Sequence, residues 1–184
     1  MPNAEKTVAV VFPGQGAQRP GMGKDFYECL SVCREAYDEA AAALGWDVAR
    51  MCFEEDERLD QTEYTQPCLL TTEIAMFRGL KELYGLAPDY YGGHSLGEFT
   101  ALVAAEVMSL GEAVRIVHNR GRLMQAAVPV GLGGMAAIIA EELDAEELEE
   151  ALAGLPVDIA NINSPRQIVI SGDAGALPDA AVRI

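Results

Sequence analysis

One short motif in the sequence has residue types that could carry out covalent catalysis. Gly93, Ser95 and Gly97 form a Gly-x-Ser-x-Gly core. In a nucleophile elbow, a serine with this spacing sits at a tight turn between a strand and a helix, and the glycines let neighbouring backbone pass closely. Ser95 is therefore the first candidate nucleophile, although the motif alone also fits an ordinary glycine-rich turn.

The segments on either side of the motif favour the elbow. Residues Ala87–Tyr91 are typical of a loop that enters a short buried strand, and residues Leu96–Val107 have the composition of a helix. Ser95 would then lie at a helix N-terminus, where unpaired N–H groups favour negative charge.

A second candidate is an arginine on the apolar side of a predicted helix, Gly111–Ala127. At about 100° per residue, Arg120 falls near the middle of an apolar stripe, and Arg115 and Arg122 fall opposite. The stripe consists of Ala113, Ile116, Val117, Arg120, Met124 and Ala127. A buried guanidinium keeps its charge, so it needs an anionic partner or a water-filled pocket.

Two partners for Arg120 are open at this point. A carboxylate of the chain could pair with it, since 29 acidic residues are present. The anion could instead arrive with a substrate, because the planar fork of arginine donates two parallel hydrogen bonds to a carboxylate. Together with a serine nucleophile, the second alternative indicates an acyl donor that bears a free carboxylate.

Composition narrows the function classes. The 184 residues carry a formal charge of −16, which argues against a nucleic-acid or anionic-membrane surface. No apolar run has membrane-spanning length and no signal peptide is evident, so we expect a cytoplasmic protein. The four cysteines lack metal-ligand spacing and are expected to be free thiols, and the seven carboxylates of residues 141–150 are expected on a solvated helix face.

The predicted elements of the first part alternate strand and helix, which indicates an α/β core with a largely parallel sheet. A valine-rich strand, Thr7–Phe12, ends at the loop Pro13–Gly16. Helices are predicted over Phe26–Leu44 and Pro67–Tyr84, with a polar loop or short helix over Glu54–Thr65 between them.

Glycines and proline after residue 128 mark a boundary, so we predict parts over residues 1–130 and 131–184. The second part reads as strand, acidic helix, strand, strand: Met135–Ala140, Asp144–Ala153, Val157–Ile162 and Gln167–Ser171. This order resembles the first two-thirds of a ferredoxin-like unit, and the ten residues from Gly175 onward are too few for its last helix and strand.

Several motifs, in this order, resemble the malonyl-CoA:acyl-carrier-protein transacylase family, which includes the acyltransferase domains of fatty-acid and polyketide synthases. They are Phe12–Gln18 (FPGQGAQ), Gly21–Gly23, Thr65–Pro67, Gly93–Glu98 (GHSLGE), Arg120–Gly121 and Asn161–Pro165 (NINSP). The resemblance spans nearly the whole chain and corresponds to the N-terminal half to two-thirds of the family. It implies an α/β, hydrolase-like parallel-sheet core with a nucleophile elbow, and an incomplete ferredoxin-like small subdomain.

The resemblance also implies a reaction. Ser95 would attack the thioester of malonyl-CoA, form a malonyl-enzyme and pass the acyl group to the phosphopantetheine thiol of an acyl carrier protein. Backbone N–H groups of Gln15 and Leu96 would form the oxyanion hole, and Arg120 would hold the malonyl carboxylate. The coenzyme A thioester is then a substrate, with no bound cofactor and no metal.

Further pocket positions follow from the same resemblance. Gln66 maps to the pocket, and Asn161 and Asn163 map to the small subdomain near it. His94 adjoins Ser95, but adjacent residues around a sharp turn point apart, so we expect a supporting role rather than that of general base. His118 falls opposite the apolar stripe and is expected at the surface.

The general base of the family is a histidine well beyond the small subdomain, and no histidine follows His118 in this sequence. A serine hydroxyl is a weak nucleophile without a base. We therefore expect a fragment, one part of a split enzyme or a degenerate relative, which is stably folded only with a complementing C-terminal segment or by self-association.

Two other function classes stay open. A serine hydrolase or thioesterase would need a later acid and histidine, or a patatin-like aspartate such as Asp173. A non-catalytic remnant could still bind a carrier protein or a partner subunit.

Overall fold

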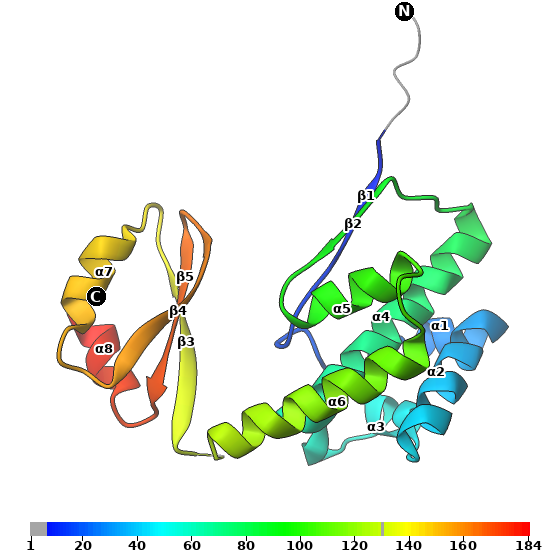
Figure 1. Ribbon diagram of the computed structural model, residues 1–184, viewed down its shortest axis with the longest axis horizontal. Helices are drawn as coiled ribbons and strands as arrows, with labels where there is room; N and C mark the ends of the chain where they lie inside the picture. Colours follow the sequence, from blue (N-terminus) through cyan, green and yellow to red (C-terminus); the bar gives the residue numbers. More distant parts are fainter. Residues whose placement is uncertain (1–6, 130) are drawn as a thin grey trace, which may run out of the picture. The chain divides into compact units, whose positions relative to one another are not determined.

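The computed structural model describes residues 7–129 and 131–184, which form two compact units (Figure 1). The first unit ends at Gln125 and the second begins at Ala126. Helices and a parallel strand pair build the first unit, and an antiparallel sheet with two helices builds the second. The predicted α/β class is confirmed.

Two parallel strands form the sheet of the first unit. β1 pairs with β2, with Ala9 opposite Tyr90 and Phe12 opposite Gly93. Parallel neighbours need a crossover connection, which the helices between the two strands supply. The elements are β1 (Ala9–Phe12), α1 (Lys24–Cys29), α2 (Ser31–Leu44), α3 (Val48–Phe53), the 3₁₀ helix η1 (Glu57–Asp60), α4 (Thr62–Tyr84), β2 (Tyr90–Gly93), α5 (Leu96–Ala104) and α6 (Leu110–Ala127).

One face of this strand pair lies on the core. The Phe77 ring of α4 meets the rings of Phe12 and Tyr91 edge-on, at centroid distances of 5.9 and 6.0 Å. On the other face, Val11 is 76% exposed and Tyr90 is 65% exposed. The prediction of a buried strand before Ser95 is therefore wrong for Tyr90, and Val11 is exposed on the same face. The reason is that α5 and the Phe77 ring of α4 pack on the opposite face, which carries Phe12.

Two predicted helix boundaries are also wrong. The segment Phe26–Leu44 is interrupted at Leu30, whose backbone is extended (φ −123°, ψ 129°). α4 begins at Thr62 and contains Pro67 in its interior, although proline there removes a helix hydrogen bond. Gln66 and Pro67 are both buried, so tertiary packing outweighs the local preference against helix at this step.

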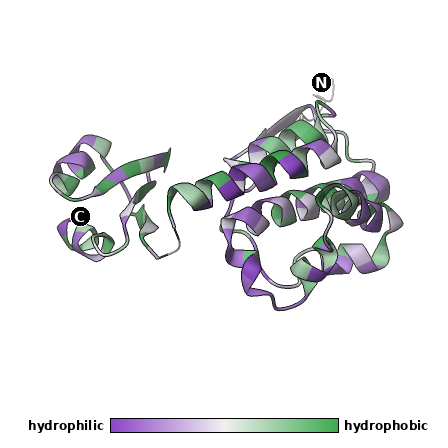
Figure 2. Cartoon of the chain, turned by 60° about the horizontal axis from the view of Figure 1, so that its bottom comes forward, coloured by the Kyte–Doolittle hydropathy of each residue, from purple (hydrophilic) through white to green (hydrophobic). Residues whose placement is uncertain are grey.

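The predicted apolar stripe of α6 is correct in part, since Ala113 and Val117 are buried. Ile116 and Met124 are 44% and 46% exposed, so they do not belong to the buried face. Arg120 lies at the border of that face and is half-buried. Figure 2 shows hydrophilic and hydrophobic residues alternating around the helices. The buried residues of α6 are Leu110, Ala113, Val114, Val117 and Gly121.

The second unit is a three-stranded antiparallel sheet in the order β3-β5-β4. Asp144 caps α7 through bonds from the N–H groups of Glu146 and Glu147, at 2.8 and 3.3 Å. The elements are β3 (Gly133–Ile139), α7 (Ala145–Leu152), β4 (Val157–Ser164), β5 (Gln167–Asp173) and α8 (Leu177–Arg183). Their shared core consists of Leu148, Leu152, Val157, Ile168, Ile170 and Ala180.

A buried carboxyl joins α4 to α5. Thr100 donates its hydroxyl to Glu73 Oε2 at 2.5 Å. The other oxygen, Oε1, is buried and has no hydrogen-bond partner among the described residues. Burial raises the pKa of Glu73 from 4.5 to about 7, against the smaller opposite effect of the Thr100 bond.

The raised pKa of Glu73 predicts a pH-dependent stability. The native state binds the proton more tightly than the unfolded state, so this contribution to the free energy of unfolding is complete below pH 4.5 and is lost as the pH rises through about 7. Glu73→Gln removes the titration. We therefore expect the difference in free energy of unfolding, variant minus wild type, to rise by on the order of 2 kcal/mol as the pH increases from about 4.5 to about 8. Urea unfolding at a series of pH values measures this difference.

The matched control for this prediction is Glu35→Gln, at an exposed position of α2. Its stability difference from wild type should not change over the same pH range. If the free energy of unfolding of Glu73→Gln changed with pH just as that of wild type does, the raised pKa of Glu73 would be contradicted.

Candidate functional site

Ser95 occupies a strained turn between β2 and α5. Its backbone has φ 54° and ψ −102°, and Glu106 is the other non-glycine residue with positive φ in the described part of the chain. Such a conformation costs about 1–3 kcal/mol and is most often retained where function needs it. The residue is exposed, so a ligand can reach its hydroxyl.

The glycines of the motif are required by close backbone contacts. A Cβ on Gly93 would overlap the backbone of Gly97, and a Cβ on Gly97 would overlap the backbone of Phe12 and Pro13. The turn that carries Ser95 is therefore pressed against the end of β1. This is the close approach that the spacing of the motif predicts.

Arg120 reaches Ser95 from α6. Its Nη2 donates to Ser95 Oγ at 3.0 Å, and its Nη1 donates to Gln66 Oε1 at 2.7 Å. No carboxylate within residues 7–129 and 131–184 forms an ion pair with it. Of the two alternatives for its partner, the structure thus gives no support to pairing with a carboxylate of the chain.

Gln66 is held in the orientation that offers its oxygen to Arg120. The side chain is 1% exposed and comes from α4. Its Nε2 donates to the thioether sulfur of Met124 at 3.4 Å. A thioether can only accept, so the NH₂ end faces Met124 and the carbonyl end faces the guanidinium.

Phe99 also contacts Arg120, and sequence reasoning missed it. The guanidinium carbon lies 5.7 Å from the centroid of the Phe99 ring. Phe99 stands one helical turn after Ser95 in α5. That spacing was the available signal, since positions four apart share a helix face.

The predicted oxyanion residues lie in adjoining segments. Leu96 is the first residue of α5, so its N–H has no partner within the helix. Gln15 is exposed in the loop after β1, and its Nε2 donates to Thr62 Oγ1 at 3.1 Å. A Cβ on Gly14 would come within 2.7 Å of the carbonyl oxygen of His94, so the loops after β1 and β2 touch.

His94 is bound through its backbone rather than to the nucleophile. Its N–H donates to Phe12 O at 3.1 Å, and its carbonyl accepts from the N–H of Gly97 at 2.9 Å. The imidazole makes no hydrogen bond to Ser95 in the described structure.

His118 differs from its prediction as a surface residue. It is half-buried, and its Nε2 lies 3.2 Å from an oxygen of Glu63. The rings of Trp46 and Tyr64 flank it, at centroid distances of 6.4 and 6.1 Å. It thus connects α6 to the first turn of α4, and it makes no hydrogen bond to Ser95 in the described structure.

The remaining predicted pocket residues lie on β4 of the second unit. Asn161 is exposed and pairs with Val169, and Asn163 donates its Nδ2 to Gln167 Oε1 at 2.9 Å.

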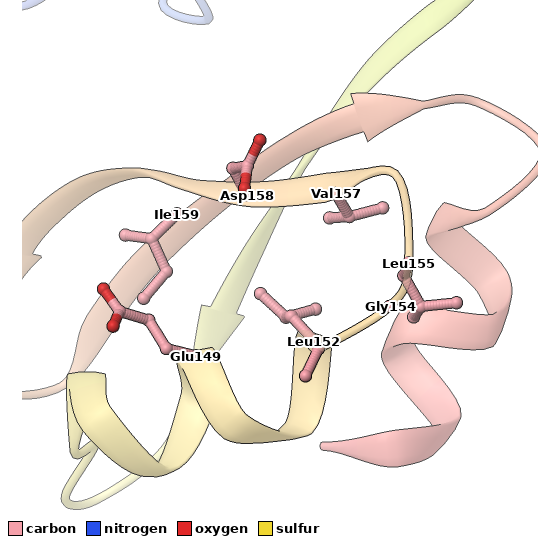
Figure 3. A pocket seen from close by; sticks show the side chains of 8 residues that line it. Glu149, Leu152, Gly154, Leu155, Val157, Asp158 and Ile159 are labelled. Atoms are coloured by element: carbon pink, nitrogen blue, oxygen red, sulfur yellow. The ribbon is translucent and has the colours of Figure 1, made fainter.

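A hollow of about 360 Å³ lies between α7 and β4 (Figure 3). The side chains labelled there are aliphatic or acidic, so it offers neither a nucleophile nor a cation.

Two features are absent from the part of the chain that the structure describes. No group of three or more His, Cys, Asp or Glu residues there could hold a metal ion. None of the helices described combines the length and apolar character that crossing a bilayer requires.

Comparison with known proteins decides the family. The profile of the family described as "Acyl transferase domain" matches residues 9–183. The chain belongs to this acyl transferase family. The match confirms the resemblance that the motifs predict.

Its curated relatives are malonyl CoA-acyl carrier protein transacylases. The Bacillus subtilis (strain 168) protein is 46% identical over 173 residues, covering 91% of this chain and 54% of that protein. The Escherichia coli (strain K12) protein is 45% identical over 172 residues, covering 92% and 56%. The acyl transferase chain therefore spans about half the length of the curated relatives it matches.

Solved structures of transacylases are similar to this chain in fold. FabD from Acinetobacter baumannii has a TM-score of 0.87 and 46% identity, covering 96% of this chain and 58% of that one. A malonyl-transacylase in complex with a type II PKS acyl-carrier protein also has a TM-score of 0.87, with 39% identity and coverage of 97% and 59%.

Gly121 provides a test of how tightly α6 packs against α4. A Cβ at this position would lie 2.5 Å from Thr62 O and 2.8 Å from the Cα of Glu63, so Gly121→Ala must push α6 away from α4. We expect a loss of about 1–3 kcal/mol in the free energy of unfolding, measured by urea titration.

Gly111→Ala in the same helix is the control for Gly121→Ala. Its Cβ would meet only the Cβ of Ala43, at an ordinary 3.6 Å, so alanine should be neutral or stabilising there. Equal stability of the two variants would show that the contact between α4 and α6 is not tight.

Proposed function

We propose that this acyl transferase chain takes part in transferring a malonyl group from malonyl-CoA to the phosphopantetheine thiol of an acyl carrier protein, through an acyl ester on Ser95. One observation carries the proposal. The guanidinium of Arg120 is half-buried beside the Ser95 hydroxyl, and its two oxygen partners, on Gln66 and Ser95, are neutral. A substrate carboxylate would supply the missing negative charge.

In the proposed reaction, the turn between β2 and α5 acts as a nucleophile elbow. Ser95 Oγ attacks the thioester carbonyl, the C–S bond breaks and coenzyme A leaves as the thiol. The N–H groups of Leu96 and Gln15 would stabilise the oxyanion. The thiol of the carrier then attacks the ester, and Ser95 Oγ regains its proton.

A general base is needed for both steps, and the histidines of this chain do not provide it. His94 has backbone partners, and His118 contacts Glu63 and two aromatic rings. We propose, from the family resemblance, that the base is a histidine from a complementing C-terminal segment. Self-association is the alternative way to give the chain a stable fold, although a second copy brings no further histidine.

The two parts of the chain would have different roles in this scheme. We propose that residues 1–130 belong to the large α/β subdomain and that residues 131–184 form a partial ferredoxin-like subdomain. Asn161 and Asn163 would line the acyl pocket from the latter. The relatives are named malonyl CoA-acyl carrier protein transacylases, and one solved relative is in complex with a type II PKS acyl-carrier protein, which supports an acyl carrier protein as the partner. We propose fatty-acid or polyketide synthesis as the pathway and the cytoplasm as the location.

The proposal is tested by acylation of Ser95. The chain, mixed with the C-terminal part of the Bacillus subtilis relative, is incubated with malonyl-CoA, and its intact mass is measured. We expect one malonyl group on wild type and none on Ser95→Ala. Arg120→Ala should lower the malonylation rate about tenfold or more, because hydrogen bonds to charged groups contribute about 1.5–3 kcal/mol.

Acetyl-CoA serves as the matched substrate, since it lacks only the carboxylate. Arg120→Ala should slow acetylation far less than malonylation. Absence of any acyl mass from the mixture would support a non-catalytic remnant. Release of free malonate without a thiol acceptor would support a hydrolase instead.

A further inference from the structure

Three cations in the described structure lie over aromatic rings. Arg58 lies 5.6 Å from the Tyr64 centroid, Lys81 lies 5.6 Å from that of Phe77, and Arg120 lies 5.7 Å from that of Phe99. The first two cations also have a carboxylate partner, Asp56 and Glu106 respectively. Arg120 has none in the described part, so its ring contact carries more of the stabilisation of its charge.

Arg120 makes two kinds of contact, hydrogen bonds from its Nη atoms and an approach of its guanidinium carbon to an aromatic ring. A guanidinium is planar, and all its N–H groups point outward in that plane. Gln66 Oε1 and Ser95 Oγ accept from the two Nη atoms and therefore lie along the edge. An aromatic ring attracts a cation through its negative face, so Phe99 can contact the guanidinium without using a donor.

We propose that Phe99 is a positioning residue that fixes the plane of the Arg120 guanidinium and thereby favours acyl groups bearing a carboxylate over neutral ones. This inference rests on the proposed function. Hydrogen bonds to Gln66 and Ser95 restrain one edge but leave the plane free to rock about it. The Phe99 ring removes that freedom, because α5 holds it one turn after the serine that the acyl group must reach.

A fixed plane matters for a carboxylate and not for a methyl group. Two parallel N–H···O bonds require the carboxylate and the guanidinium to be coplanar. A guanidinium that is already oriented loses less conformational freedom when it binds the acyl group. A neutral acyl group makes no such bonds, so it gains nothing from the orientation. Phe99 should therefore change the ratio of the two acylation rates.

The experiment compares Phe99→Leu with Phe99→Tyr. Leucine keeps an apolar side chain but has no aromatic face, and tyrosine keeps the face. The first readout is the ratio of the malonylation rate to the acetylation rate of Ser95. Both rates are measured by intact mass, with the chain mixed with the C-terminal part of the Bacillus subtilis relative as above. We expect leucine to lower this ratio about threefold to tenfold and tyrosine to keep it within about twofold of wild type.

The second readout needs no acylation. In NMR spectra of the arginine side chains of the 184-residue chain, an ordered guanidinium gives separate Nη signals because rotation about Nε–Cζ is slow. The signals of Arg120 are assigned as those that disappear in Arg120→Lys. We expect its Nη signals to be separate in wild type and Phe99→Tyr and to merge in Phe99→Leu. The control Tyr84→Leu removes a ring that is 77% exposed at the end of α4, and it should change neither readout.

The outcomes separate this inference from the proposed function. If wild type accepts neither acyl group, the proposed function fails, and the Arg120 signals alone decide whether Phe99 orders the guanidinium. If wild type is malonylated but a folded Phe99→Leu keeps the wild-type ratio and separate Nη signals, the role of Phe99 is wrong. Should Phe99→Leu fail to fold, as shown by its urea unfolding, Phe99→Met takes its place in the same comparison.

Discussion

The site depends on a positive charge that cannot be removed by titration. Arginine stays protonated in proteins, and burying its charge without compensation is costly. Arg120 receives that compensation from neutral groups alone in the described structure: two oxygens that accept from its Nη atoms and one aromatic ring over which it lies. Those groups come from α4, from the turn after β2 and from α5. Three separate elements must therefore converge on one guanidinium.

Glycines make that convergence possible. Gly97 lets the serine turn press against the backbone of Phe12 and Pro13, and Gly121 lets α6 press against the backbone of Thr62. Contacts between backbones allow little adjustment, because no side chain can rotate away to relieve an overlap. The distance between Arg120 and Ser95 is thus set mainly by packing of rigid helices, which positions functional groups more closely than loops do.

The sequence predicts the chemistry of the site better than its geometry. Ser95 follows from the spacing of two glycines, and Arg120 follows from helical periodicity, even though Ile116 and Met124 of the expected stripe are exposed. Both signals are local. The spacing of Phe99 from Ser95 places the two on one side of a helix, but it does not link Phe99 to Arg120, which lies 21 positions away. Met124 lies 58 positions from Gln66, and no spacing rule links that pair. The same limit applies at Leu30 and Pro67, where tertiary packing outweighs local preference.

The contact between Arg120 and Ser95 also bears on selectivity in the proposed reaction. Before acylation, Ser95 Oγ is one of two oxygens that accept from the guanidinium. Acylation turns this hydroxyl into an ester oxygen, which is a poorer acceptor, so Arg120 loses a partner as the new bond forms. A malonyl group brings a carboxylate that replaces the lost partner with a charged one, whereas an acetyl group brings nothing. A hydrogen bond to a charged group contributes about 1.5–3 kcal/mol, so this difference alone amounts to a preference of about tenfold to a hundredfold.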